Sequence, residues 1–125
     1  MIVKDEKLHH AILAAFGDKE VFKIIDSVMI LPKSMADISK ETDIPRTNVF
    51  RKIKWMLENR LVIIEKTNIT EGGRKTSLFR SAWKSIGAKF ELGTVHVEVE
   101  QNIDQAGIIT KKLSSIDTMP DENSD

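Results

Sequence analysis

Apolar residues recur at helical spacing through the first part of the chain. The positions Leu8, Ala11, Ile12 and Ala15 predict a helix over residues 4–16, which Gly17 ends. Asp18 is expected to cap a second helix, because its carboxylate can accept hydrogen bonds from the free amides of the first turn. The apolar stripe of that second helix contains Val21, Phe22, Ile25, Val28 and Met29, and we expect it to end near Pro32.

A short third helix and a longer fourth helix follow. Ser34 is predicted as the N-cap of the third helix, with Asp37 three residues later as a near capping box. Residues 42–45 form the turn, and Pro45 suits the first helical position, where its missing amide has no cost. The fourth helix is expected to run to about Asn59. Its inward face contains Val49, Ile53, Met56 and Leu57.

The period then changes from helix to strand. Residues 61–69 are rich in β-branched residues, and residues 76–80 form the returning strand after a turn at 71–74. The pair Gly72-Gly73 is expected to supply the positive φ angles that a tight hairpin needs. A second pair of strands is predicted at 88–92 and 95–100, with Val95, Val97 and Val99 on one face.

A capped helix, a turn and a longer amphipathic helix form a helix-turn-helix, and a following hairpin with glycine and bases at its tip makes a winged helix. Ala36-Asp37-Ile38 precedes Thr47-x-Val49-x-x-x-Ile53, and Leu57-Glu58 leads to Leu61-Val62. This pattern resembles the core of ArsR-like winged-helix transcriptional regulators of the small archaeal type, over roughly residues 22–82. The resemblance implies sequence-specific binding of double-stranded DNA, with residues 46–60 as the recognition helix in the major groove.

The chain departs from that pattern at Arg60, where the family usually has glycine. A residue near such a C-cap often takes a left-handed conformation, which costs a residue other than glycine about 1 kcal/mol. We expect Asn59 to be able to take that conformation instead.

The pattern therefore predicts an α+β fold: a winged helix-turn-helix of three to four helices and a β-hairpin wing, with an extra C-terminal β-hairpin. Residues 1–82 are expected to form the DNA-binding domain and residues 83–116 an extension that serves dimerisation. In residues 104–116 a helix is possible, although Gly107 weakens it, and residues 117–125 form an acidic tail that we expect to be disordered.

The amino-acid composition limits the classes of protein to which this chain can belong. The chain has 125 residues, one domain's worth, with 41% hydrophobic and 30% charged residues, which are globular values. Its first residues lack the apolar core of a signal peptide, and no stretch approaches the roughly 20 apolar residues of a membrane span. The absence of cysteine suits a reducing compartment. We expect a soluble cytoplasmic protein that does not enter the membrane.

The net charge of zero conceals an uneven distribution. Residues 46–89 hold 11 Lys and Arg against three Glu, a net charge of +8, whereas residues 117–125 hold four acids and no base. Such asymmetry favours binding of an anionic partner, although a basic face that is merely solvated is an alternative. The acidic tail is a candidate for screening the basic face.

Candidate DNA-binding residues are those with donors or methyl contacts on the outer side of the fourth helix, at the start of the third helix or at the wing tip near residues 71–75. They are Lys33, Ser34, Arg46, Thr47, Asn48, Phe50, Arg51, Lys54, Arg74 and Lys75. Lys52, Arg60 and Lys66 are interpreted as charges within range of phosphates or simply solvated. Phe50 either contacts DNA or packs against the preceding helix, and Trp55 and Trp83 are either core residues between the fourth helix and the hairpin or partner surface.

The sequence does not indicate catalysis. His9 and His10 are adjacent, so a helix would point them about 100° apart, and His96 with Glu98 is a weak surface candidate for a metal. We expect no enzyme, no metal and no cofactor. We also expect a homodimer, formed either by the N-terminal helix with Leu8, Ile12 and Phe16 or by the segment after Trp83. A winged-helix protein-interaction module of the transcription machinery is the alternative function, and sensing of an unknown small-molecule effector is a third possibility.

Overall fold

The computed structural model describes residues 1–102, as four helices followed by four strands. The helices are α1 (Glu6–Phe16), α2 (Lys19–Ser27), α3 (Met35–Thr42) and α4 (Arg46–Glu58). The strands are β1 (Val62–Ile69), β2 (Lys75–Ser81), β3 (Trp83–Glu91) and β4 (Thr94–Gln101). This is an α+β fold, compatible with the winged-helix arrangement that the sequence predicts. The predictions for residues 104–116 and for the acidic tail lie outside the described residues.

The helices begin where the sequence places capping side chains. Asp18 accepts hydrogen bonds from the amides of Glu20 and Val21, and Ser34 accepts one from the amide of Asp37. Both predicted caps are therefore confirmed. Helix α1 begins two residues later than expected, because Asp5 is its N-cap and accepts a hydrogen bond from the amide of Leu8.

The turn between α3 and α4 differs from the prediction by one position. Pro45 is the N-cap of α4 and not its first helical residue, because its backbone is extended with φ −56° and ψ 144°. Its carbonyl oxygen accepts hydrogen bonds from the amides of Asn48 and Val49, which starts the helix at Arg46. Helix α3 ends with Asp43 in the left-handed conformation, at φ 65°.

The structure corrects two predictions about where and how helices end. Helix α2 stops at Ser27 rather than near Pro32, because the carbonyls of Val28 and Met29 accept hydrogen bonds from Ser81, Arg80 and Asn102 instead of continuing the helix. At the end of α4, Asn59 keeps a negative φ of −106°, and Arg60 itself is left-handed at φ 61°. The expectation that Asn59 would take this conformation is wrong.

The four strands form two separate antiparallel hairpins. In β1–β2, Val62 is opposite Ser81 and Ile69 is opposite Lys75, with an irregularity in β1 between Ile64 and Lys66. Of its two turn glycines only Gly73 has a positive φ, 80°, so the expectation for the pair holds for one member. The second hairpin is longer than predicted, because β3 begins already at Trp83 and pairs along its length with β4.

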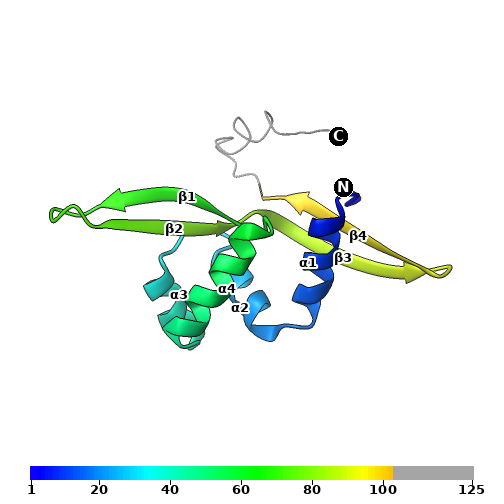
Figure 1. The fold of residues 1–125 in the computed structure, drawn as a ribbon, viewed down its shortest axis with the longest axis horizontal. Helices are drawn as coiled ribbons and strands as arrows, with labels where there is room; N and C mark the ends of the chain where they lie inside the picture. The colour runs from blue at the N-terminus through cyan, green and yellow to red at the C-terminus, as the bar shows by residue number, and fades with distance from the viewer. Residues whose placement is uncertain (103–125) are drawn as a thin grey trace.

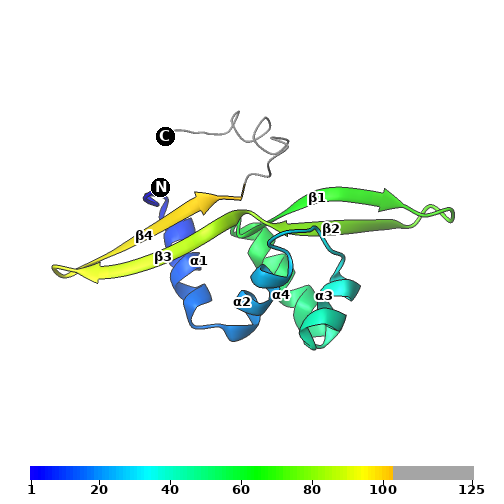
Figure 2. The same ribbon diagram turned by 180° about the vertical axis from the view of Figure 1, so that it is seen from behind.

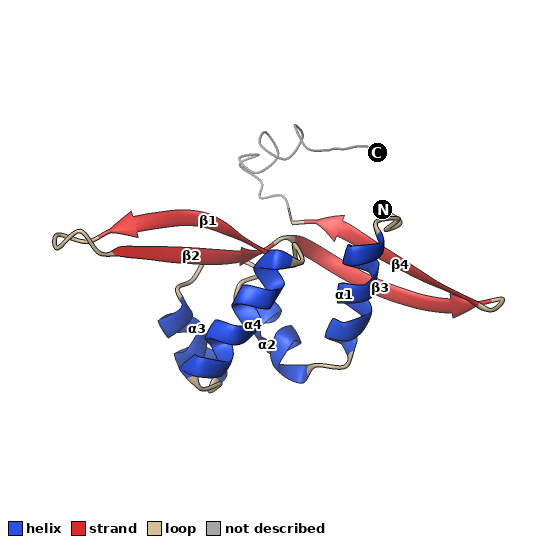
Figure 3. Cartoon of the chain, in the orientation of Figure 1, coloured by secondary structure: helices blue, strands red, loops and turns tan. Residues whose placement is uncertain are grey.

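Both hairpins lie on the same side of the helices and project in opposite directions (Figures 1 and 2). Hairpin β1–β2 extends past α3, and hairpin β3–β4 runs behind α1 and beyond it, as the colouring by secondary structure in Figure 3 makes clear. Two further contacts attach the strands to the helical part. Residues 1–3 pair with β4 through the amide of Val3 and the carbonyl of Val97, and the backbone of Lys33 pairs with that of Phe79.

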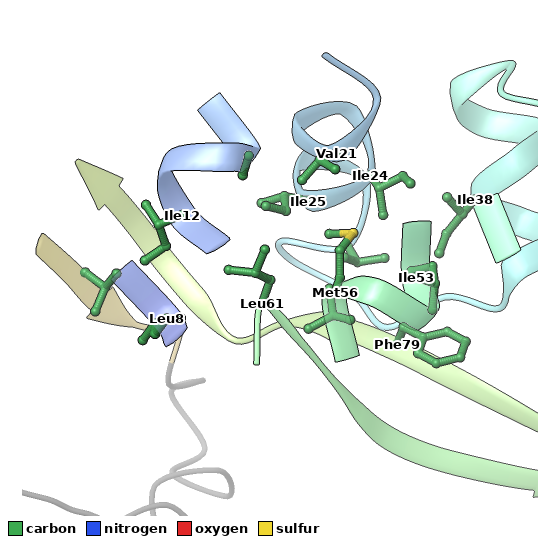
Figure 4. Packing of buried hydrophobic residues seen from close by; sticks show 14 of the residues in the cluster. Leu8, Ile12, Val21, Ile24, Ile25, Ile38, Ile53, Met56, Leu61 and Phe79 are labelled. Atoms are coloured by element: carbon green, nitrogen blue, oxygen red, sulfur yellow. The ribbon is translucent and has the colours of Figure 1, made fainter. Parts of the chain in front are cut away.

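A single hydrophobic core connects all of these elements. Fully buried residues include Ile12 of α1, Ile24 of α2, Ile38 of α3 and Ile53 of α4. Figure 4 shows these side chains directed toward one another, with Met56 and Leu61 between them. Val97 and Val99 of β4 belong to the same cluster, so the described part of the C-terminal extension shares the core of the helices.

Candidate nucleic-acid interface

Helix α4 is held in place by one buried face and by polar contacts at its middle and just beyond its C-terminus. Val49, Ile53 and Met56 are fully buried, as the helical period of the sequence predicts. At the middle of the helix, the ammonium of Lys52 donates to the carboxylate of Asp18 at 2.5 Å. Just beyond its C-terminus, the indole Nε1 of Trp83 donates to the carbonyl oxygen of Arg60 at 2.9 Å. The orientation of α4 is therefore fixed relative to α2 and to the strands.

The opposite face of α4 is open to solvent and carries basic and polar side chains. Its exposed members are Arg46, Thr47, Phe50, Arg51 and Lys54. Phe50 is 55% exposed, so more than half of its surface is free of contacts with the preceding helix. A large apolar side chain among basic residues on an exposed helix face is suited to contact another molecule, for example the methyl group of a thymine.

Asn48 and Arg51 form a polar pair on this surface. The Nη2 atom of Arg51 donates to Oδ1 of Asn48 at 2.8 Å, one helical turn away. Asn48 is half-buried and Arg51 is exposed. The pair limits the rotamers of the guanidinium and directs it toward the N-terminal half of α4.

The structure places Lys33 and Ser34 in supporting positions. The ammonium of Lys33 forms an ion pair with Glu41, whose carboxylate also accepts from the hydroxyl of Ser27 at 3.1 Å. The hydrogen bonds from Lys33 and then from Ser27 lower the pKa of Glu41 below its usual value. The hydroxyl oxygen of Ser34 caps α3. The Ser34 side chain therefore stabilises the start of α3, and that of Lys33 is held by the last turn of the same helix, so neither is as free as those on the outer face of α4.

Arg74 and Lys75 are exposed at the distal end of the β1–β2 hairpin. The turn is closed by hydrogen bonds from the amide of Thr70 to the carbonyl of Arg74 and from the amide of Arg74 to the hydroxyl oxygen of Thr70. Figure 1 shows this tip projecting well beyond α3, so the basic residues of the tip and those of α4 lie at separate parts of the molecule.

Ion pairing divides the basic residues at positions 46–89 into two groups. Lys52, Arg60, Arg80, Lys84 and Lys89 form ion pairs with nearby acids. Within residues 1–102, no ion pair involves the basic residues on the outer face of α4 or those of the β1–β2 hairpin other than Arg80. These residues are Arg46, Arg51, Lys54, Lys66, Arg74 and Lys75. Among residues 46–89, the basic residues without an ion pair thus lie on α4 and the first hairpin.

The two tryptophans are both partly buried against the core. Trp83 lies between the end of α4 and the strands, as expected for a core residue. Trp55 instead lies beside α1, where it lines a shallow hollow of about 490 Å³ together with His10, Ala11 and Ala14. An adjoining hollow of about 320 Å³ is lined by Trp55, Arg51 and Asp18.

The described parts of both surfaces that the sequence offers for dimerisation are partly buried within the chain. Leu8 and Ile12 of α1 are buried, and so are Val97 and Val99 of β4 in the same cluster. Phe16 of α1 and Val95 of β4 stay exposed, at 47% and 37%. Sequence reasoning missed this internal contact, and it also missed the exposed tip of β3–β4, where Phe90 and Leu92 lie.

Other classes of site have little support in the described residues. Residues 1–102 contain no group of three or more His, Asp or Glu side chains that would hold a metal ion. None of α1–α4 combines the length and apolarity that crossing a bilayer requires. Comparisons of the chain with protein-family models, with curated proteins and with solved structures found no match.

Proposed function

We propose that this protein is a transcriptional regulator with a winged-helix fold of the ArsR-like type, which binds double-stranded DNA through α4. The observation that carries the proposal is the division of α4 into two faces. One face, with Val49, Ile53 and Met56, is anchored in the core, and the other presents Arg46, Arg51 and Lys54 without ion pairs in the described chain. A helix in the major groove needs this combination of anchoring and exposed donors.

The roles of the residues follow from their chemistry. Arg51, held by Asn48, can bond to the O6 and N7 atoms of guanine, and Thr47 and Phe50 can contact thymine methyl groups. Arg74 and Lys75 on the β1–β2 wing would contact the phosphate backbone or the minor groove. Lys33 and Ser34 would contribute the amides of the α3 N-terminus to a phosphate more than their own side chains. A homodimer would present two such helices and would double these contacts.

The decisive experiment compares two double variants of the full chain by fluorescence anisotropy with a random DNA duplex. Arg51→Ala with Lys54→Ala removes two charges from α4, and Lys19→Ala with Lys23→Ala removes two exposed charges from α2. We expect the first pair to weaken binding at least tenfold at low salt and the second to change it little, with the circular dichroism spectra of both unchanged. Equal losses would mean that only net charge matters, and no loss would refute the assignment of α4.

Salt dependence separates this function from the protein-interaction alternative. Binding to duplex that falls steeply between about 50 and 200 mM salt is the result expected from displaced counterions. Selection of binding sites from a random duplex pool then tests whether α4 reads sequence. Recovery of no preferred site, together with no binding at low salt, would favour the protein-interaction module.

A further inference from the structure

Two adjoining hollows form a groove between α1 and α4. They have volumes of about 490 and 320 Å³, and both are lined by Ala14 of α1 and Trp55 of α4. Helix α1 contributes the small side chains of Ala11 and Ala14 on the side where Trp55 lies, so the space between the two helices is not filled. Each volume lies within the range of sites that bind small molecules.

Trp55 forms the floor of the groove and has an unused donor. Its side chain is half-buried, so that one part packs against the core while another part faces the groove. In the described part of the chain, no hydrogen bond involves its indole Nε1, whereas Nε1 of Trp83 donates to Arg60. An indole that offers both an apolar surface and a free N–H suits a flat aromatic ring that carries an acceptor.

The charges around the groove favour an anionic group at one end. Arg51 lines that end and forms no ion pair among residues 1–102, and the neighbouring Asp18 is already paired with Lys52 at 2.5 Å. The other end is lined by Glu6, Lys7, His10 and Asn59. One acid and one lysine balance each other there, so Arg51 supplies the net positive charge of the groove.

We infer that this groove binds a small aromatic anion, whose ring lies on Trp55 and whose carboxylate accepts hydrogen bonds from Arg51. The guanidinium has five N–H donors and uses one of them in the bond from Nη2 to Asn48 at 2.8 Å. Its planar fork matches a carboxylate, and bonds to an ionised acceptor are stronger than a bond to the neutral amide of Asn48. From Arg51 to Asn59 the groove follows α4 for about 12 Å, enough for a ligand with two fused rings.

The ligand would regulate the proposed DNA contact, because Arg51 belongs to both sites. Its fork can bond to a guanine or to the carboxylate of the ligand, but not to both at once. The ligand is therefore expected to weaken duplex binding, and the duplex to weaken ligand binding by the same factor. This regulatory step rests on the proposed function, whereas the binding of the ligand does not.

The test is a titration of the isotope-labelled full chain with naphthoate, followed by NMR through the indole N–H signals. The chain has two tryptophans, so there are two such signals, and Trp55→Phe assigns them by removing one. We expect the Trp55 signal to shift saturably, with a Kd between about 0.1 and 1 mM, while that of Trp83 stays in place. The neutral naphthamide should bind about tenfold more weakly, because it lacks the charge that Arg51 recognises.

Two matched variants separate the groove from the rest of the surface. Ala14→Leu fills the part that both hollows share without changing a charge, and should abolish the shift of the Trp55 signal. Ala36→Leu makes the same change at an exposed position of α3 and should leave ligand binding unchanged. In fluorescence anisotropy at constant ionic strength, naphthoate at about 5 mM should weaken duplex binding by the natural chain at least about fivefold, but not by Ala14→Leu.

Contrary outcomes overturn stated parts of the inference. A Trp55 signal that does not move, equal shifts of both indole signals, or a shift that persists in Ala14→Leu would show that the groove is not the site. Tighter binding of an oligothymidylate than of naphthoate would identify single-stranded nucleic acid as the occupant. If ligand and duplex both bind and neither affects the other, the regulatory step is wrong. If no duplex binds while the Trp55 signal responds, the proposed function and the regulatory step fail and the binding site stands.

Discussion

The carboxylate of Asp18 joins two helices, because its Oδ2 atom lies 2.5 Å from Nζ of Lys52 while its Oδ1 atom accepts from the first amides of α2. Both side chains are less than one-third exposed. A single residue thus caps α2 and fixes the rotation of α4, the helix that we propose reads DNA. Lys52, although basic and on α4, is a supporting residue and not part of the exposed set.

Removal of either partner should affect stability to different degrees. Asp18→Ala loses the cap and the ion pair, and should lower the free energy of unfolding by about 1–2 kcal/mol. Lys52→Met keeps the cap and the packing of the aliphatic stem, so we expect a loss of about 1 kcal/mol or less. Urea denaturation of the two single variants and the double variant would measure the coupling. Fully additive losses would show that the contact contributes nothing.

Acid should weaken the fold through Asp18 and Glu41. Burial alone would raise the pKa of Asp18, but the hydrogen bonds from Lys52, Val21 and Glu20 outweigh it, and the pKa is lowered. Because the folded pKa values of both carboxyls are lowered, their contribution is complete above the ordinary values of 3.8 and 4.5. It is lost as the pH falls through the lower folded values.

The measurement is the urea midpoint between about pH 7 and pH 2.5. Asp18→Asn retains a side chain that can cap α2 but cannot titrate, so its midpoint should fall less steeply below about pH 4 than that of the natural chain. The matched control is Asp26→Asn, which removes an exposed acid from the same helix. It should leave the acid limb of the curve unchanged, and an equal flattening by both variants would remove Asp18 as the cause.

The sequence predicts most of the helical part because the signals there are local. Asp18 and Ser34 act as caps within their own helices, and the period of Val49, Ile53 and Met56 marks the buried face of α4. The exposed face of α4 then follows from geometry alone. These features depend only on residues close together in the sequence. The structure confirms both caps and the buried face.

The remaining features depend on contacts between distant parts of the chain. The end of α2 is set by Arg80 and Asn102, which lie more than 50 residues away and bond to the carbonyl of Met29. Leu8 is buried in a cluster that also contains Val97 of β4, and the ammonium of Lys33 is held by an ion pair with Glu41. An alternating strand such as β4 does not reveal which of its apolar residues will be covered, so Val95 was not distinguished from Val97.

The left-handed residue after α4 allows a sharp test of backbone strain. Arg60→Gly should raise the free energy of unfolding by up to about 1 kcal/mol, because glycine adopts φ 61° without steric cost. The ion pair with Asp5 that is lost is largely exposed and contributes less than about 1 kcal/mol. Asn59→Gly, at a negative φ, should instead destabilise the protein. Thermal denaturation that ranked the two variants in the opposite order would place the strain elsewhere.

The β1–β2 wing should contribute to DNA affinity through its charge, but it should not contribute to the choice of DNA sequence. Each phosphate contact changes the slope of log K against log salt by about 0.9, so Arg74→Ala with Lys75→Ala should reduce that slope by up to about 2. The site selected from a random duplex pool should stay the same, because phosphate contacts carry no direct base information. Lys84→Ala with Lys89→Ala removes the same charge from the other hairpin, where both lysines are paired with acids, and should leave the slope nearly unchanged. If both double variants reduce the slope equally, the β1–β2 tip does not contact DNA and acts only through the net charge of the protein.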